Sequence, residues 1–123
     1  MPDASAALAL LLDERGGDRV SRAEADAVIG AVSLTEVLQR LERLGVPPEM
    51  LDAADAQFGG RVAPFTEAQA RDAARLYPAT RPLGLSLGGR ACLALARALA
   101  APVLTADRSW AGLDVGVVVE VIR

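Results

Sequence analysis

The chain has 123 residues, a formal net charge of −3 and a hydrophobic fraction of 52%. This length fits one domain over residues 1–123, and high hydrophobicity with low net charge excludes intrinsic disorder. The apolar runs are too short to cross a membrane and no basic segment precedes the run at 6–12, so we expect a cytoplasmic protein without a targeting segment or membrane contact.

Apolar residues at helical spacing alternate along the chain with short, continuous apolar runs that are typical of buried strands. In chain order we expect helix 4–12, helix 18–25, strand 27–32, helix 33–45, helix 47–58, strand 61–65, helix 66–76, loop 77–84, helix 86–101, strand 102–106 and strand 115–122. Strands separated by helices imply βαβ units. The predicted fold class is therefore α/β, with a mainly parallel central sheet flanked by helices.

Three carboxylates follow predicted strands. Asp3 lies where a short first strand would end, Glu36 lies in the first helical turn after strand 27–32, and Asp107 directly follows strand 102–106. Parallel sheets place ligands beyond the carboxyl ends of their strands, so all three side chains are expected at one edge of the sheet. Carboxylates brought together in this way repel one another unless a divalent cation binds them, and the functional interpretation is a metal site.

Each carboxylate also has a purely structural interpretation. Asp3 is suited to cap the first helix, and Asp107 is suited to cap a short turn at 108–112. Ser33 and Glu36 match a capping box, and Glu36 precedes Arg40 by one helical turn. Glu36 also lies about 140° from the apolar stripe of its helix, as a solvated residue would. A structural role is the more common one for each residue alone, whereas their joint placement favours a site.

The residue types that are missing limit the chemistry further. There is no His, Lys or Asn, and all 13 basic residues are Arg. His-based nucleophilic catalysis, His-ligated metal sites and lysine Schiff bases are excluded. The single Cys92 can form neither an internal disulfide nor a zinc cluster, and its position on an apolar stripe indicates a core residue. Carboxylates, arginines and hydroxyls remain, and they favour a metal ion held by Asp and Glu.

Four short segments, spread in order over the whole chain, carry a resemblance to a known family. They read DASA at 3–6, SLTEV at 33–37, LSLGGRACLALA at 85–96 and LTAD at 104–107. The set resembles the PIN-domain nucleases and, among them, the VapC-type toxins of bacterial toxin–antitoxin pairs. The resemblance implies an α/β/α sandwich and a divalent-metal-dependent endoribonuclease that cuts structured RNA such as transfer RNA. It also implies a homodimer that a cognate antitoxin neutralises.

The resemblance assigns roles to particular residues. Asp3, Glu36 and Asp107 fall on three of the four acidic positions of the family and would hold Mg²⁺ or Mn²⁺. Ser5 and Thr105 stand beside the first and last acids, where a bond to a metal-bound water and a capping or turn role are both open.

Two features depart from the family pattern. Gly89 occupies the fourth acidic position, and because glycine supplies no ligand we expect impaired metal binding and cleavage, whether the glycine is natural or introduced. Only Met1 and Pro2 precede Asp3, and proline lacks the donor of a central strand, so the first strand should be very short.

The remaining basic and aromatic residues leave alternatives open. Arg90 and Arg108 neighbour the site positions and are candidates for binding RNA phosphates, although ordinary surface arginines are an equal alternative. An acidic chain is unusual for an RNA-binding protein. Trp110 is either a buried anchor or an interface residue. Two rival functions remain: an inactive PIN-like protein that retains antitoxin binding or dimerisation, and an unrelated α/β binding domain whose acids only cap helices.

Overall fold

The structure is a computed structural model that describes residues 1–23 and 26–123. The strands of these two ranges are β1 (Ile29–Gly30), β2 (Val62–Ala63), β3 (Val103–Thr105) and β4 (Val119–Val121). The α-helices are α1 (Ala4–Leu11), α2 (Gly17–Ala23), α3 (Ala31–Arg43), α4 (Pro48–Phe58), α5 (Glu67–Arg75), α6 (Tyr77–Thr80) and α7 (Leu87–Leu99). The 3-10 helices are η2 (Arg81–Leu83) and η3 (Arg108–Gly112).

All strand pairing is parallel among the residues described. β1 pairs with β2, β3 pairs with β4, and Pro2 forms a single parallel bridge with Leu104. The Asp3 amide donates to the Leu104 carbonyl at 2.9 Å, and the Leu104 amide donates to the Met1 carbonyl at 2.9 Å. Neither bond uses a donor on Pro2, so proline is tolerated here. The predicted α/β class is confirmed, and the first strand is reduced to one bridge as expected.

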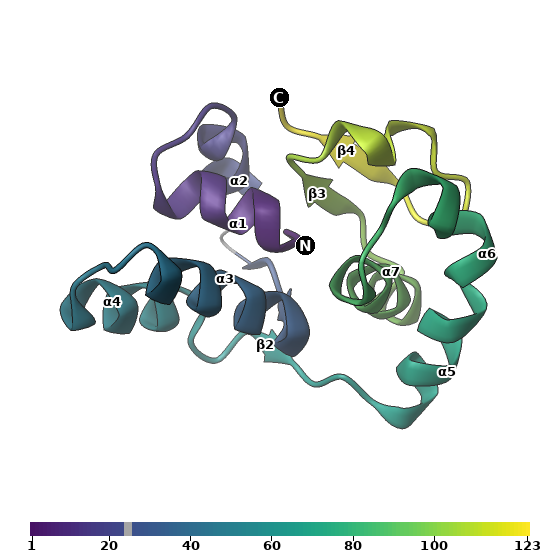
Figure 1. The fold of residues 1–123 in the computed structure, drawn as a ribbon, viewed down its shortest axis with the longest axis horizontal. Helices are drawn as coiled ribbons and strands as arrows, with labels where there is room; N and C mark the ends of the chain where they lie inside the picture. The colour runs from purple at the N-terminus through teal and green to yellow at the C-terminus, as the bar shows by residue number, and fades with distance from the viewer. Residues whose placement is uncertain (24–25) are drawn as a thin grey trace.

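The helices lie on both sides of these short strands. Figure 1 shows α1 to α4 on one side of the molecule and α5 and α6 on the other, with the chain start beside α1 in the middle. Helix α7 packs against both α3 and α5, which makes it the link between the two sides. The helices flank the parallel strands as predicted, but in the described residues these strands form two separate two-stranded sheets and not one central sheet. No helix in the described ranges combines the length and the apolar character that a membrane span needs.

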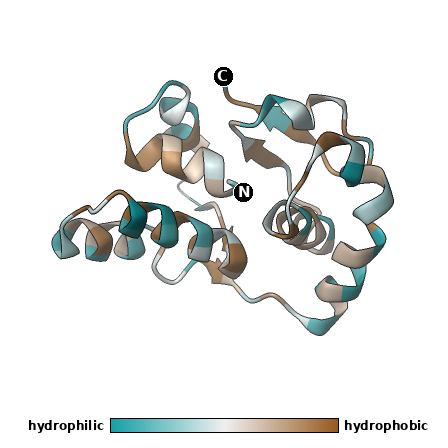
Figure 2. Ribbon diagram, in the orientation of Figure 1, coloured by the Kyte–Doolittle hydropathy of each residue, from teal (hydrophilic) through white to brown (hydrophobic). Residues whose placement is uncertain are grey.

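Within the described residues, the core consists of three clusters of buried apolar side chains. Figure 2 shows a hydrophobic β3, whereas α3 and α4 carry both hydrophilic and hydrophobic segments, as expected of helices that cover a core. The clusters gather around α7, between α3 and α4, and beneath α1. Their fully or almost fully buried members include Leu93 and Val103 in the first, Ile29, Val37, Leu41 and Phe58 in the second, and Ala6, Ala9 and Val20 in the third.

The predicted strand 27–32 is much shorter in the structure, and the helix after it begins earlier. Helix α3 starts at Ala31 with Gly30 as its N-cap, so the predicted start at Ser33 is wrong. The capping box of Ser33 and Glu36 is therefore wrong too, because Ser33 is buried inside the helix and hydrogen-bonds Cys92. A continuous apolar run does not distinguish a buried strand from the start of a buried helix, which explains the error.

The predicted loop 77–84 is helical. It forms α6 and η2, with Pro78 and Pro82 in the first turns, where a missing amide donor breaks no helical bond. Gly84 ends this segment in the left-handed conformation with φ of 71°. Proline is thus a helix start here and not a loop signal.

The remaining elements keep their predicted type but change in length. Strands 61–65 and 115–122 shorten to β2 and β4, and α7 ends at Leu99 because Ala100 turns left-handed. The starts predicted at positions 66 and 86 are confirmed, with Thr66 and Ser86 as the N-caps of α5 and α7. Of the predicted helix 18–25, residues 24–25 lie outside the described residues.

Candidate functional site

The three predicted carboxylates line one cavity of about 450 Å³. Its walls are the start of α1, one face of α3, the start of α7 and the segment at η3. This volume lies within the range of about 300–1,000 Å³ that is usual for ligand sites. The polar and charged side chains that line it are those of Asp3, Ser5, Ser33, Glu36, Gln39, Arg40, Arg43, Ser86 and Asp107.

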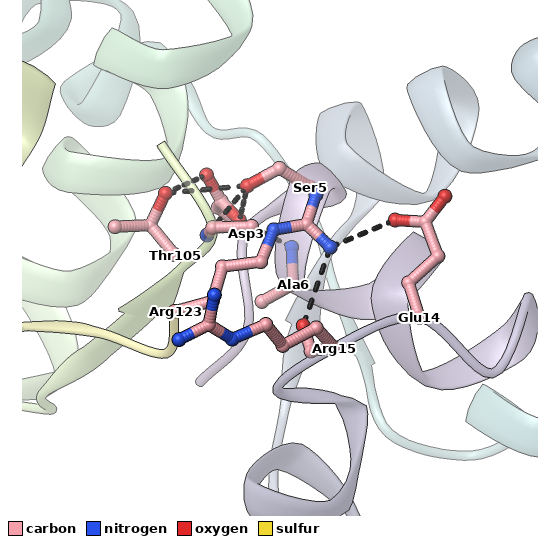
Figure 3. Close-up of polar contacts among 8 residues, drawn as sticks. Asp3, Ser5, Ala6, Glu14, Arg15, Thr105 and Arg123 are labelled. Carbon is pink, nitrogen blue, oxygen red and sulfur yellow. Dashed lines mark hydrogen bonds and ion pairs between the residues drawn. The ribbon is translucent and has the colours of Figure 1, made fainter. Parts of the chain in front are cut away.

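Asp3 is held by hydrogen bonds on both of its carboxylate oxygens. It is the N-cap of α1, and its Oδ1 accepts from the Ala6 amide and from the Ser5 hydroxyl, each at 2.8 Å. Its Oδ2 accepts from the Thr105 hydroxyl at 2.7 Å (Figure 3). Only 6% of Asp3 is exposed, and this burial raises the pKa of its carboxyl, with repulsion from Asp107 adding to the effect. The capping interpretation is confirmed, and the capping carboxylate also faces the cavity.

Ser5 and Thr105 connect the start of α1 to the end of β3. The Thr105 hydroxyl accepts from the Asp107 amide at 3.1 Å while it donates to Asp3. The Ser5 hydroxyl accepts from the Ala106 amide at 2.9 Å while it donates to Asp3. Thr105 therefore has the local turn role considered from the sequence, whereas Ser5 makes a long-range contact to Ala106 that the sequence did not predict. Together the two hydroxyls fix the position of Asp3 relative to Asp107.

Glu36 is positioned by packing against a glycine. It is half-buried where α3 meets α7, and a Cβ atom added to Gly88 would lie 2.2 Å from its Oε1. Burial raises the pKa of the Glu36 carboxyl, and the charge of Asp3 raises it further. No described residue, Arg40 included, forms an ion pair or hydrogen bond with this carboxylate. The helical wheel predicts a solvated Glu36, but the residue is half-buried because α7 packs against this part of α3. A helical wheel describes one helix and does not include such a neighbour.

Asp107 has the capping role predicted for it. Its Oδ1 accepts from the Ser109 amide at 2.9 Å at the start of η3. Like Asp3, it is a helix cap that lines the cavity. The structural and functional interpretations of these residues therefore do not exclude each other.

Gly89 lies against the ring of Trp110. A Cβ atom at position 89 would be 3.0 Å from Cζ2 of Trp110 and 3.5 Å from side-chain atoms of Leu85. Trp110 is 4% exposed, which confirms the buried-anchor interpretation. An aspartate at position 89 would thus enter the cavity wall only if Trp110 shifted by a few tenths of an ångström. No pattern in the sequence signals this contact.

The donor atoms around the cavity fit a hydrated divalent cation better than a cation enclosed by carboxylates. Among residues 1–23 and 26–123, no three Asp, Glu, His or Cys side chains lie close enough together to hold one metal ion. Mg²⁺ keeps several waters and binds through one or two carboxylates, and all donors here are oxygens. Burial is the main cause of the raised pKa values of Asp3 and Glu36, and the repulsion from neighbouring carboxylates that adds to it is what a cation would relieve.

The structure places the two arginines proposed from the sequence outside the cavity lining. Arg90 donates to the Leu85 carbonyl at 2.9 Å and lies 5.2 Å from the centre of the Tyr77 ring. Arg108 donates through Nε to the Arg123 carbonyl at 3.0 Å. The arginines that do line the cavity are Arg40 and Arg43. Sequence reasoning missed them, although their spacing after Glu36 puts all three on one helix face.

Cys92 is buried at 3% exposure, as its position on the apolar stripe of α7 indicated. Burial raises the pKa of its thiol to about 12, with the charge of Asp3 as the next contribution. The thiol is therefore protonated and unreactive at neutral pH.

Comparison with known proteins gives the family. The PIN domain family matches residues 1–115, so this chain belongs to the PIN-domain family. Among solved structures it is similar to a toxin–antitoxin complex from Klebsiella pneumoniae, with a TM-score of 0.72 and 18% identity over 95% of this chain and 93% of that chain. At this identity the likeness concerns the fold. No curated protein matches. The family match confirms the resemblance to PIN domains and excludes an unrelated α/β domain.

Proposed function

We propose that this chain is a divalent-metal-dependent endoribonuclease toxin that hydrolyses RNA phosphodiester bonds and is neutralised by a cognate antitoxin. The observation that carries the proposal is that Asp3, Glu36 and Asp107 line one cavity in a PIN-domain fold. The likeness to a chain from a toxin–antitoxin complex supports the antitoxin as partner. Transfer RNA-like substrates, a homodimer and a cytoplasmic location belong to the same proposal.

The three carboxylates have different roles in this proposal, because they are held in place in different ways. Asp3 and Asp107 are fixed by hydrogen bonds, so they are suited to hold Mg²⁺ or Mn²⁺ in a constant place. The chemistry that the bound cation supplies is charge stabilisation at the scissile phosphate and activation of a water. Glu36 has no hydrogen bond from the described residues, so both of its oxygens are available to orient that water.

We propose that Gly89 weakens this site. It leaves the fourth acidic position without a carboxylate, and no Asp or Glu lies between Asp72 and Asp107 to replace it. An aspartate introduced at this position adds charge and also presses on Trp110. The added carboxylate should raise the cleavage rate, whereas the contact with Trp110 should lower it, so the two effects must be measured separately.

The test is RNA cleavage by the chain, by Gly89→Asp and by Gly89→Ala, with Mn²⁺ or Mg²⁺ and with EDTA. Gly89→Ala adds the steric contact with Trp110 but no ligand, so it is the matched control. We expect Gly89→Asp to cut RNA faster than the chain itself and Gly89→Ala to cut it no faster than the chain. EDTA should stop cleavage by all three proteins. If the chain cuts as fast as Gly89→Asp, position 89 is not a needed ligand.

A second candidate function is an inactive PIN-like protein that keeps antitoxin binding or dimerisation. The glycine at position 89 and the lack of a three-acid cluster within the described ranges favour it. If neither the chain nor Gly89→Asp cuts RNA in Mn²⁺, this second function replaces the first. A rise in Tm with Mn²⁺ that Asp107→Asn abolishes would still place a metal at the carboxylates.

A further inference from the structure

Helix α3 brings two arginines into the cavity beside the carboxylates. Glu36, Arg40 and Arg43 are spaced by four and three residues, so they lie along one face of α3, and all three line the cavity. At 1.5 Å per residue, Arg43 lies about 10 Å from Glu36 along the helix axis. The cavity therefore has an acidic region at the start of α1 and in the second turn of α3, and a basic region that follows within the next two turns of α3.

These two arginines have no partner among the described residues. Neither Arg40 nor Arg43 forms an ion pair or a side-chain hydrogen bond with any described residue, and both are exposed. Most other arginines of the described ranges are engaged, including the ion pairs of Arg22 with Asp18, Arg71 with Glu67 and Arg123 with Glu14. In a chain of net charge −3, two unpaired guanidinium groups in one cavity are available to an anionic ligand.

We propose that Arg40 and Arg43 bind backbone phosphates of the RNA on one side of the scissile phosphate, as substrate-positioning residues. This inference rests on the proposed ribonuclease function. The distance of about 10 Å from Glu36 to Arg43 corresponds to roughly three stacked nucleotides at about 3.4 Å each. The planar guanidinium group matches the geometry of a phosphate and binds it through two hydrogen bonds.

These arginines would offset the repulsion between the acidic residues of the cavity and RNA. Asp3, Glu36 and Asp107 repel a polyanion, so an RNA strand needs attraction close to them to remain in the cavity. Arg40 and Arg43 supply it on the same wall that carries Glu36. Because phosphates are identical along the strand, these contacts set the affinity and the register of the RNA and not its sequence preference.

The test measures how salt weakens RNA binding. The affinity of a labelled single-stranded RNA is followed by fluorescence anisotropy in EDTA, from about 50 to 200 mM KCl. The proteins are the full chain, Arg40→Gln, Arg43→Gln and the double variant. Arg75→Gln is the matched control, because Arg75 is exposed on α5, lies outside the cavity lining and makes no ion pair with another described residue. Cleavage in Mn²⁺ is measured on the same samples.

Each lost phosphate contact should lower the slope of log affinity against log salt concentration by about 0.7, and the double variant by about 1.4. Arg75→Gln should leave the slope unchanged, and all variants should keep the Tm of the parent chain. In the cleavage assay, the loss should appear mainly in KM and be similar for different RNA sequences.

Other results overturn the inference in ways that separate it from the proposed function. If the chain cuts RNA and the arginine variants keep the parental slope, the ribonuclease function stands and the inference is wrong. If the chain neither binds nor cuts RNA, both fall. If RNA does not bind but a polyglutamate peptide does, and Arg40→Gln weakens that binding, the arginines serve an acidic protein ligand instead.

Discussion

Asp3 and Glu36 belong to the same cavity but are held in place in different ways. Asp3 accepts three hydrogen bonds from Ser5, Ala6 and Thr105, and it is almost fully buried. Glu36 accepts none from the described residues, and its carboxylate rests on the bare backbone of Gly88. The Asp3 carboxylate is therefore held by polar partners, whereas the Glu36 carboxylate occupies the space left by the missing side chain of Gly88.

Because the two carboxylates are held differently, different substitutions should displace them. Removing a hydroxyl loosens Asp3, while adding one methyl group at position 88 displaces Glu36. The first change costs hydrogen bonds and therefore stability. The second change moves a functional group and leaves the fold intact. Activity and stability measurements on the two sides should separate accordingly.

A large effect on the cleavage rate, without a loss of stability, is expected for Gly88→Ala. The new Cβ atom would lie 2.2 Å from Oε1 of Glu36, so the carboxylate must move by more than about 1 Å to restore ordinary contact. A misplacement of this size reduces cleavage about 100-fold. Alanine is a better helix former than glycine by about 1 kcal/mol, so a lower rate would not come from a weaker α7.

The control for this prediction is Gly112→Ala, where a Cβ atom meets nothing within 4 Å and φ is not positive. Cleavage rates and Tm are measured for both variants. Equal rates for Gly88→Ala and the parent chain would show that Glu36 has no part in the reaction.

Thr105→Val tests the polar side of the comparison. Valine keeps the shape of the fully buried Thr105 but removes the donor to Asp3 and the acceptor for the Asp107 amide. Buried groups left without partners cost about 1–3 kcal/mol, so the free energy of unfolding should fall by that amount in urea titrations. Thr35→Val, at an exposed position on α3, should change it by less than about 0.5 kcal/mol. An unchanged free energy for Thr105→Val would contradict the role given to this network.

Asp3→Asn should raise the stability of the chain, in contrast to Thr105→Val. Asparagine still caps α1 and can donate to Thr105, but it removes a buried charge whose pKa is raised. We expect the free energy of unfolding to rise by about 0.5–2 kcal/mol while cleavage and the stabilising effect of Mn²⁺ are lost. Asp114→Asn, on an exposed residue, is the control and should change neither.

The gain from Asp3→Asn should depend on pH in a defined direction. Because the pKa of Asp3 is raised, the folded chain holds this proton to a higher pH than the unfolded chain, whose pKa is the ordinary 3.8. The contribution of Asp3 to stability therefore decreases as pH rises from 3.8 through the raised pKa, and it is constant above it. The advantage of the asparagine variant should grow over that window. A constant advantage would show that the charge of Asp3 carries no penalty.

The sequence predicted which carboxylates line the same cavity, but not what holds them in place. The rule that ligands gather at strand ends brought Asp3, Glu36 and Asp107 to one cavity, although the strands are only two or three residues long. The capping roles of Asp3 and Asp107 were predictable because a cap depends on the next few residues. The contact of Glu36 with Gly88 was not, since it depends on how α3 crosses α7. For the same reason the closeness of Trp110 to Gly89 appears only in the folded chain.

The division of the strands into two separate pairs has a mechanical consequence for this cavity. Glu36 follows β1 and Asp107 follows β3, and within the described ranges no ladder of backbone hydrogen bonds joins these two pairs. The distance between the two carboxylates is set instead by side-chain packing of α3, α7 and the segment at η3. A core that loosens under mild heating or denaturant keeps its helices longer than its packing. The arrangement of the carboxylates should therefore be the first property lost, with the far-ultraviolet circular dichroism still that of the native chain.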